Sequence, residues 1–168
     1  SEDGKYIAHE DVSKFKLEPV KADEEMKEFE IAEQPEWVKT MEDNLKHYQK
    51  DKKHFLKNVV YKNRQGDIII ATIRGDLEVN KTKLEQVLKL VGQLEPAEEA
   101  DLTSIGTKAG WVHSWGHTFS QAQKTADGKR DRKVIYVADE SLKTVKNFIG
   151  GQKEATTDSI NVNYGRDF

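Results

Sequence analysis

The sequence predicts an α/β domain in which a mixed central β-sheet is flanked by helices. Residues 68–73 form an apolar, mostly β-branched run bounded by turn residues, which is typical of a strand buried on both faces. Helical spacing begins after Asn80, where apolar residues recur at i, i+3, i+4 and i+7 from Leu84. Further strand and helix patterns interleave, and residues 63–66 suit a tight hairpin, so the sheet is expected to mix parallel and antiparallel pairs.

The strand at 68–73 and the helix that follows it are expected to form the centre of the fold. Asn80 is a suitable N-cap, because its side-chain oxygen can accept hydrogen bonds from free N–H groups of the first helical turn. Val79 and Leu84 occupy the positions of a hydrophobic staple. The predicted apolar face of this helix comprises Leu84, Val87, Leu88 and Val91. The Arg-Gly-Asp corner at 74–76 joins a strand to a helix, where ligand sites are common, and is expected to be partly structural.

The segments before this unit have weaker patterns. Residues 5–12 suit a short edge strand, and the charge-rich residues 14–35 suit a connecting segment. A helix is expected to open near Pro35, with one face made of Trp37, Met41, Leu45 and Tyr48. Residues 55–62 alternate in polarity, which predicts a strand with one face made of Phe55, Lys57, Val59 and Tyr61.

The segments after the central helix continue the alternation of helices and strands. Residues 96–105 are typical of a helix, with a proline at the start and a glycine just past the end. We expect a glycine- and aromatic-rich loop at residues 106–117 and an exposed polar loop or hairpin at 118–133. Two further strands are expected at residues 134–138 and 158–164. Asp139 is expected to cap a helix that ends at a pair of glycines and whose apolar face is Leu142, Val145, Phe148 and Ile149.

The bulk properties of the chain limit the possible functions. At 168 residues it suits one domain with its own core, and residues 1–168 are expected to form a single domain. Charged residues make up 34% and the net charge is −3, which argues against a strong free-standing nucleic-acid binder. There is no cysteine for disulfide or thiol chemistry, and no apolar run approaches the ~20 residues of a membrane span. The acidic N-terminus lacks a start methionine and a signal-peptide pattern, which predicts a piece excised from a longer cytoplasmic protein.

No cofactor or metal motif is present, so none is expected. The five histidines lack HExxH spacing, and His113 and His117, four residues apart, lie among glycines that favour a loop. No glycine-rich phosphate-binding motif occurs. Ser114 follows His113, but no acidic residue can be assigned to orient a serine nucleophile.

Two ordered motifs resemble those of a known family. Residues 73–80, IRGDLEVN, with Lys83 and Leu84, resemble the IRGDxExNxxKL segment of the editing domain inserted in bacterial-type prolyl-tRNA synthetases. The second motif resembles that domain's closing helix and its exit strand back into the synthetase, and comprises residues 134–142, 146–151 and 161–168. The resemblance covers the whole chain and is weakest at 20–50 and 111–132. It implies the fold of this editing domain, which belongs to the Ala/Cys-tRNA(Pro) deacylase-like superfamily.

The resemblance gives Lys57 a role that its strand position alone does not. A lysine on an alternating strand is usually a solvated edge charge. Residues 55–62, FLKNVVYK, resemble the family's TVKTLLVK strand, and Lys57 takes the position of that strand's functional lysine. An ammonium there is implied to contact the terminal ribose-phosphate of tRNA and to hold the ester in place.

A glycine loop is the second site that the resemblance implies. The family's GxxxP loop holds the aminoacyl carbonyl and the 3′-terminal adenosine with backbone N–H groups, and Gly110 is the catalytic candidate here. Four loop residues are candidate substrate-binding residues: Gly106, Trp111, His113 and Ser114. The last two replace a glycine and the proline of the family pattern, which leaves the loop geometry open. The alternative is an aromatic core loop with Trp111 and Trp115 buried.

Asp158 and Asn161 complete the candidate substrate-binding residues. The family commonly has a histidine that sizes the amino-acid pocket shortly before the exit strand, and the aligned position lies close to Asp158. A carboxylate there could accept hydrogen bonds from the α-amino group of the ester. The alternative is an aspartate in a turn before a strand.

The resemblance implies post-transfer editing, in which mischarged Ala-tRNA(Pro) is hydrolysed within a prolyl-tRNA synthetase. Water would attack the ester with help from a ribose hydroxyl, and a small pocket would exclude proline. The partners would be the aminoacylated 3′ end of tRNA(Pro) and the rest of the synthetase in cis, without a membrane. One alternative is a non-catalytic inserted domain that supports synthetase stability or handling of the acceptor end. Another is a free-standing deacylase, against which the exit motif argues.

Overall fold

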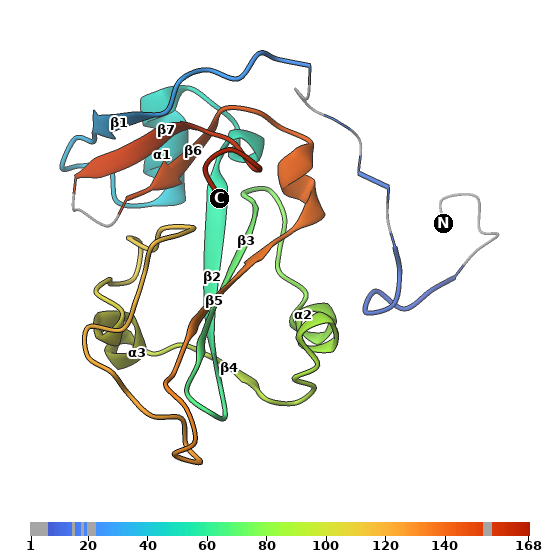
Figure 1. Cartoon of the computed structure of the whole chain (residues 1–168). Helices are drawn as coiled ribbons and strands as arrows, with labels where there is room; N and C mark the ends of the chain where they lie inside the picture. Colours follow the sequence, from blue (N-terminus) through green and yellow to red (C-terminus); the bar gives the residue numbers. More distant parts are fainter. Residues whose placement is uncertain (1–6, 15, 18, 20–22, 153–155) are drawn as a thin grey trace.

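A computed structural model of the protein (Figure 1) describes residues 7–14, 16, 17, 19, 23–152 and 156–168. Within these residues, the larger of two sheets has four strands in the order β4-β2-β3-β5, with bounds Leu94–Pro96, Leu56–Asn63, Ile68–Arg74 and Val134–Ala138. The smaller sheet has three strands in the order β1-β7-β6, with bounds Glu30–Glu33, Thr157–Val162 and Phe148–Gly151. The helices α1, α2 and α3 have bounds Met41–Tyr48, Lys81–Leu88 and Glu99–Ser104. Short 3₁₀ helices cover Lys52–His54 and Glu140–Lys143.

Strand β3 is the centre of the larger sheet. It pairs antiparallel with β2 and parallel with β5, so the predicted mixed sheet is confirmed. All seven of its residues are buried, as the apolar run predicts. The hairpin from β2 to β3 is closed by Asn63, whose side-chain oxygen accepts from the backbone N–H groups of Gln65 and Asp67 at 3.0 and 2.9 Å. The element with the clearest sequence pattern therefore organises the sheet.

The two faces of the larger sheet carry separate apolar clusters, and α2 and α3 lie on opposite sides of the sheet (Figure 1). The cluster under α2 comprises Tyr61, Ile69, Ala71, Leu84 and Leu94. Asn80 caps α2, with its side-chain oxygen 3.0 Å from the N–H nitrogen of Lys83, and Val79 packs against the same cluster. The cluster on the opposite face comprises Ile68, Ile70 and Ile105. The predicted cap is thus confirmed.

The smaller sheet packs against one end of the larger sheet. An apolar cluster, called the junction cluster below, joins the two sheets and comprises Leu56, Leu142, Val145, Phe148 and Val162. Gly150 of β6 lies so close to Leu56 that an added Cβ would be 3.0 Å from the leucine Cδ1. This close approach brings β6 and β7 beside the first residues of β2, where the cavity described below lies.

The predicted helix after Asp139 is wrong beyond its first turn. Asp139 does cap a helix, because its side chain accepts from the N–H of Ser141 at 2.8 Å, but that helix is 3₁₀ and ends at Lys143. Asn147 then adopts φ +59°, and Phe148–Gly151 forms strand β6. The apolar residues of this segment belong to a 3₁₀ helix, a short connection and strand β6, and not to one helix. They recur at helical spacing because Leu142, Val145 and Phe148 all pack in the junction cluster.

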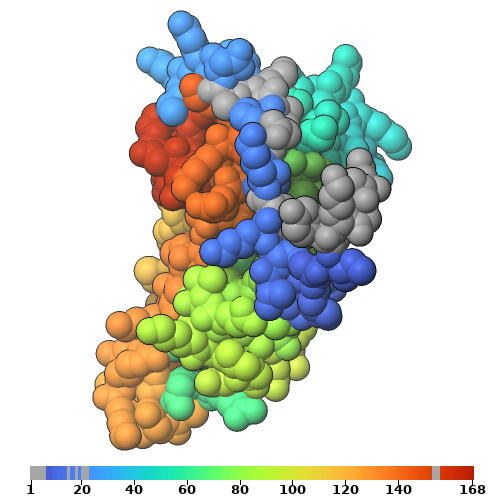
Figure 2. Space-filling model, turned by 90° about the vertical axis from the view of Figure 1, so that its right-hand side faces the viewer, coloured from blue at the N-terminus to red at the C-terminus, as the bar shows by residue number. Residues whose placement is uncertain are grey.

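The N-terminal segment lies over α2 and does not form the predicted strand in its described part. The N–H groups of Val12 and Ser13 both donate to the carbonyl of His9, which closes a turn, and residues 5 and 6 lie outside the described residues. Figure 2 shows the N-terminal residues, in blue, against α2, in yellow-green. The Asn80 amide donates to Asp11 at 2.9 Å, and the Lys83 ammonium donates to the Ser13 carbonyl at 2.6 Å.

Other element boundaries also differ from the sequence prediction. Strand β1 lies inside the expected connecting segment, where it pairs with β7. Helix α1 begins at Met41, so Trp37 precedes it and is 53% exposed. Strand β4 takes Pro96 out of the expected helix because β4 pairs with β2, and α3 begins only at Glu99. Helix α2 ends at Leu88, and both Val87 and Val91 are exposed, which leaves them outside the core.

Candidate active site

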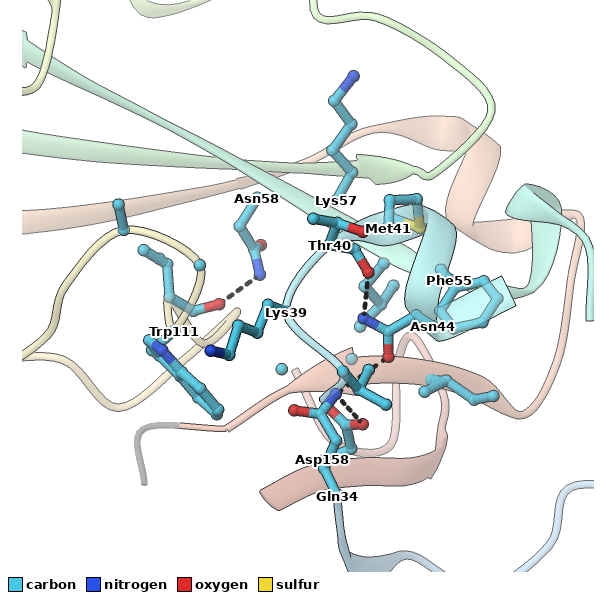
Figure 3. Close-up of a pocket in the computed structure, with 18 of the residues that line it drawn as sticks. Gln34, Lys39, Thr40, Met41, Asn44, Phe55, Lys57, Asn58, Trp111 and Asp158 are labelled. Carbon is cyan, nitrogen blue, oxygen red and sulfur yellow. Dashed lines mark hydrogen bonds between the residues drawn. The ribbon is translucent and has the colours of Figure 1, made fainter. Parts of the chain in front are cut away.

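A cavity of about 520 Å³ opens where the two sheets meet. Its walls come from the start of β2, the residues before and within α1, the loop at 108–112, β6 and Asp158 of β7. Figure 3 shows Trp111 on one side of this cavity, Thr40 and Asn44 on another, and Gln34 with Asp158 at the bottom. Segments far apart in the sequence therefore contribute to one site.

The open edge of β2 forms one wall of the cavity. Strand β4 pairs with β2 only from Tyr61 to Asn63, so among the described strands it leaves the β2 edge at Asn58 uncovered. The Val60 carbonyl accepts from Ala97 N–H on this edge at 3.0 Å. Because backbone groups two residues apart face the same way, the N–H and C=O of Asn58 point outward at the cavity.

Lys57 lines the cavity, but its ammonium lies on the other side of β2. The side chain is 28% exposed, and its Nζ is 2.5 Å from Glu78 Oε1 and 3.3 Å from the Leu77 carbonyl. Figure 3 shows this ammonium pointing away from Trp111 and Asp158. Strand alternation explains the direction, since Lys57 shares the face of β2 that α2 covers and Asn58 shares the opposite face.

The Gly110 loop borders the same cavity as Lys57. Gly110 adopts φ +84°, a backbone conformation that favours glycine, and its carbonyl lies near Gly151 of β6. The Thr107 hydroxyl donates to the Trp111 carbonyl at 2.6 Å and fixes the turn. The Trp111 ring lines the cavity with the Lys108 ammonium 5.6 Å from its centroid. Gly106, at φ +73°, lies outside the cavity lining.

His113 and Ser114 anchor the loop from beneath, because both are buried and neither lines the cavity. The Ser114 hydroxyl donates to Asn58 Oδ1 at 3.0 Å, and the Asn58 amide donates to the Val112 carbonyl at 2.8 Å. A ring nitrogen of His113 lies 3.2 Å from the Ser159 hydroxyl, and the His113 N–H donates to His117 Nε2 at 2.9 Å. These contacts tie the loop to both sheets.

The two tryptophans of this region have different surroundings. Trp115 packs against the junction cluster and stacks on Phe168, with 5.6 Å between ring centroids. Trp111 lies at the cavity and is partly exposed. Both rings are half-buried, so the alternative of an aromatic loop core with Trp111 and Trp115 buried is wrong for both residues.

Asp158 forms the floor of the cavity and is only 5% exposed. Its Oδ2 accepts from the Tyr48 hydroxyl at 2.7 Å and from Gln34 Nε2 at 2.9 Å. Burial raises the pKa of Asp158, and the hydrogen bonds from Tyr48 and Gln34 oppose that rise. Asn161 lies outside the cavity lining; it adopts φ +59° and its amide donates to the Glu28 carbonyl at 2.9 Å, which gives it a local structural contact.

Comparison with known proteins now decides the family. The family model for the aminoacyl-tRNA editing domain matches residues 35–168. The chain belongs to the aminoacyl-tRNA editing domain family.

This editing domain is similar to part of several much longer proteins. It is 33% identical over 132 residues to a proline–tRNA ligase of Brachyspira hyodysenteriae, which covers 78% of this chain and 20% of the ligase. It is 31% identical over 163 residues to a proline–tRNA ligase of a Thermotoga species, which covers 97% of this chain and 25% of the ligase. The editing domain thus spans about a fifth to a quarter of the length of these curated relatives.

A solved structure shares the fold of the editing domain. A candidate trans-editing enzyme for prolyl tRNA synthetase superposes with a TM-score of 0.60 at 14% identity, covering 79% of this chain and 74% of the other. At this identity the likeness concerns the fold. The mixed α/β fold expected from the sequence is therefore confirmed.

Sequence reasoning did not find every residue of the editing-domain cavity. Gln34, Asn44 and Asn58 have no sequence signal, because each is a single polar residue whose role depends on contacts across the fold. Tyr48 was expected only on an apolar helix face, yet its hydroxyl reaches Asp158. Among the described residues, no group of three or more histidines and carboxylates is placed to hold a metal ion. None of the helices in the described ranges is long and apolar enough to span a membrane.

Proposed function

We propose that this editing domain hydrolyses the ester of mischarged tRNA(Pro), with alanine as the amino acid, as an inserted part of a prolyl-tRNA synthetase. The observation that carries the proposal is the cavity itself. It places a glycine loop, a strand edge with free backbone groups and a buried carboxylate around one space, in a chain of the editing family. The similarity to proline–tRNA ligases supports tRNA(Pro) as the substrate and the synthetase as the partner in cis.

The proposed reaction is attack of water on the ester carbonyl, with release of the amino acid and the ribose hydroxyl. Backbone N–H groups of Gly110 and of the Asn58 edge, two segments that line the cavity, would stabilise the oxyanion that forms. No histidine lines the cavity, and Asp158 is engaged at its floor, so the ribose hydroxyl of the substrate would assist the water. The domain then acts by positioning the ester.

Lys57 and Trp111 would hold the 3′ end of the tRNA. A phosphate or ribose oxygen at the corner before α2 would replace Glu78 as the partner of the Lys57 ammonium. At the mouth, the Trp111 ring offers a stacking surface for the terminal adenine, and Lys39 and Lys108 also line the cavity. Single-stranded nucleic acid is commonly bound by such a combination of aromatic rings and cations.

One observation favours the non-catalytic alternative. The Lys57 ammonium is paired with Glu78 and turned away from the cavity, so it does not face a bound ester in this structure. A domain that kept this pairing would support the synthetase or the acceptor end without hydrolysis. The two functions differ in whether a bound tRNA end displaces Glu78.

The test is deacylation of alanyl-, cysteinyl- and prolyl-tRNA(Pro) by the purified chain. We expect alanyl-tRNA(Pro) to be hydrolysed at least tenfold faster than prolyl-tRNA(Pro). If cysteinyl-tRNA(Pro) is hydrolysed faster than alanyl-tRNA(Pro), the proposed reaction stands and the edited amino acid is cysteine. A folded chain with no hydrolysis above the buffer rate for any of the three would support the non-catalytic alternative.

A further inference from the structure

We propose that Gln34 and Asp158 form a binding site for a free α-ammonium group, so that the domain selects esters of unblocked α-amino acids. The inference rests on the proposed function for the identity of the ester, and it names the residues that recognise the amino-acid part. It makes the cavity floor a specificity-determining site.

The orientation of the Gln34 amide is set by two acceptors. Its Nε2 donates to Asn44 Oδ1 at 3.1 Å and to Asp158 Oδ2 at 2.9 Å, so the nitrogen must occupy this position. The Asn44 amide in turn donates to the Thr40 carbonyl at 3.1 Å, which fixes Asn44 Oδ1 as the acceptor. Gln34 Oε1 therefore points away from these two acceptors, and it accepts no hydrogen bond from the described residues although Gln34 is only 8% exposed.

Asp158 likewise has one satisfied oxygen and one free oxygen. Both of its donors, Tyr48 and Gln34, bind Oδ2. Oδ1 accepts no hydrogen bond from the described residues, and it is not among their fully enclosed polar atoms without a partner. Because Asp158 lines the cavity, the free oxygen is open to a ligand there. A carboxylate oxygen with no donor from the described residues can accept from a bound group that donates.

The charge at the floor favours an ammonium over a neutral donor. Asp158 forms no ion pair with a cation of the described residues, and the His47 imidazole on α1 acts on it only at longer range. Burial and the hydrogen bond to Asp158 raise the pKa of Tyr48, so this side chain remains a hydroxyl donor. An α-ammonium brings a positive charge and several N–H donors to a site that offers two acceptors. A hydroxyl in its place brings one donor and no charge.

The experiment compares two non-hydrolysable probes of similar size. One is 3′-(alanylamino)-3′-deoxyadenosine, and the other is its lactyl counterpart, in which a hydroxyl replaces the α-ammonium. Binding of each probe to the purified chain is measured by calorimetry. We expect the wild type to bind the alanyl probe at least tenfold more tightly than the lactyl probe. Asp158→Asn should bring the two affinities within threefold, mainly by weakening the alanyl probe.

Glu33→Gln is the matched control, because it removes one carboxylate charge from an exposed residue of the neighbouring strand β1. It should keep the wild-type discrimination. If Asp158→Asn weakens both probes equally, Asp158 has a structural role and the inference is wrong. If Asp158→Asn does not fold, the binding measurements on the wild type still test the inference. Equal binding of the two probes, or binding of neither, would overturn the ammonium site.

Hydrolysis assays separate this inference from the proposed function. A wild type that prefers the alanyl probe but does not hydrolyse alanyl-tRNA(Pro) would refute the deacylase and support the ammonium site. A wild type that hydrolyses alanyl- and lactyl-tRNA(Pro) at equal rates would support the deacylase and refute the ammonium site.

Discussion

At the scale of single residues, neighbouring side chains of β2 serve opposite sides of the sheet. Asn58 holds the Gly110 loop through the Val112 carbonyl, and Lys57 reaches the corner before α2. One step along a strand reverses the direction of a side chain, so a motif match alone does not show which space a residue faces.

Lys57→Ala is expected to leave folding intact and to lower the kcat/KM for alanyl-tRNA(Pro) tenfold or more. The reason is the loss of one charge-assisted contact, worth about 1.5–3 kcal/mol, from a side chain outside the apolar clusters. Lys62→Ala is the matched control, because Lys62 lies on the same strand, is 30% exposed and pairs with Asp101 away from the cavity. A Lys57→Ala rate equal to the wild type would remove Lys57 from the site.

Trp111→Ala is expected to weaken binding of the alanyl probe about tenfold, since stacking on a base is worth roughly 1–3 kcal/mol. Trp111→Phe should retain most of the affinity, because a smaller ring still stacks. Trp37→Ala, at an exposed tryptophan that does not line the cavity, is the control and should bind as the wild type does. If Trp111→Ala binds the alanyl probe as tightly as the wild type does, the adenine does not stack on Trp111.

At the scale of elements, two ion pairs, each with one buried partner, hold the ends of β3. At its start, Arg130 donates to both oxygens of Asp67 at 2.8 and 2.5 Å, and these bonds lower the pKa of Asp67 to about 2. Because this folded-state pKa lies below the unfolded value near 3.9, the pair stabilises the fold above about pH 4, and the contribution is lost as pH falls toward 2. The shift corresponds to about 2 kcal/mol.

Asp67→Asn should therefore lower the free energy of unfolding at pH 7 by about 2 kcal/mol and flatten its dependence between pH 5 and pH 2. Urea unfolding at several pH values measures both effects. Asp131→Asn removes a carboxylate from an exposed pair with Lys124 and should change stability by less than about 0.5 kcal/mol. If the free energy of unfolding of Asp67→Asn depends on pH in the same way as that of the wild type, carboxylates other than Asp67 cause the loss of stability in acid.

The other end of β3 is the Arg-Gly-Asp corner, which is held together by an ion pair between Arg74 and Asp76. Arg74 is buried and donates to both oxygens of Asp76 at 2.6 and 3.0 Å and to the Thr144 hydroxyl at 2.7 Å. Asp76→Ala should lower the free energy of unfolding by about 3 kcal/mol, because it leaves a buried guanidinium without its counter-charge. Glu78→Ala, at an exposed residue of the same corner, is the control for denaturant unfolding. If Asp76→Ala keeps its stability but loses hydrolysis, the corner is catalytic.

At the scale of the whole molecule, the net charge of −3 gives the chain little overall electrostatic attraction for the tRNA backbone. A synthetase that binds the tRNA body would supply its 3′ end at high effective concentration. Excision of this domain from the parent synthetase should abolish deacylation of alanyl-tRNA(Pro) and leave prolylation of tRNA within a few-fold. Wild-type deacylation by the shortened synthetase would contradict the proposed function.

Local patterns in the sequence predict the centre of the fold and the family. The apolar run of β3, the Asn80 cap and the Asn63 hairpin are local patterns, because each depends on residues a few positions apart. The family motifs are also continuous stretches of chain. For the same reason the sequence predicted Phe148–Gly151 wrongly, since whether that segment is a helix or a strand depends on pairing with β7.

The construction of the cavity depends on contacts between segments that are far apart in the sequence. Gln34, Tyr48 and Asp158 meet across 110 residues and more of chain, through hydrogen bonds that no local spacing encodes. The direction of the Lys57 ammonium and the burial of His113 likewise follow from the packing of the two sheets and the loop. A hydrogen bond is worth only about 1 kcal/mol and acts only at contact distance, so its partners are chosen after the core has placed their backbones.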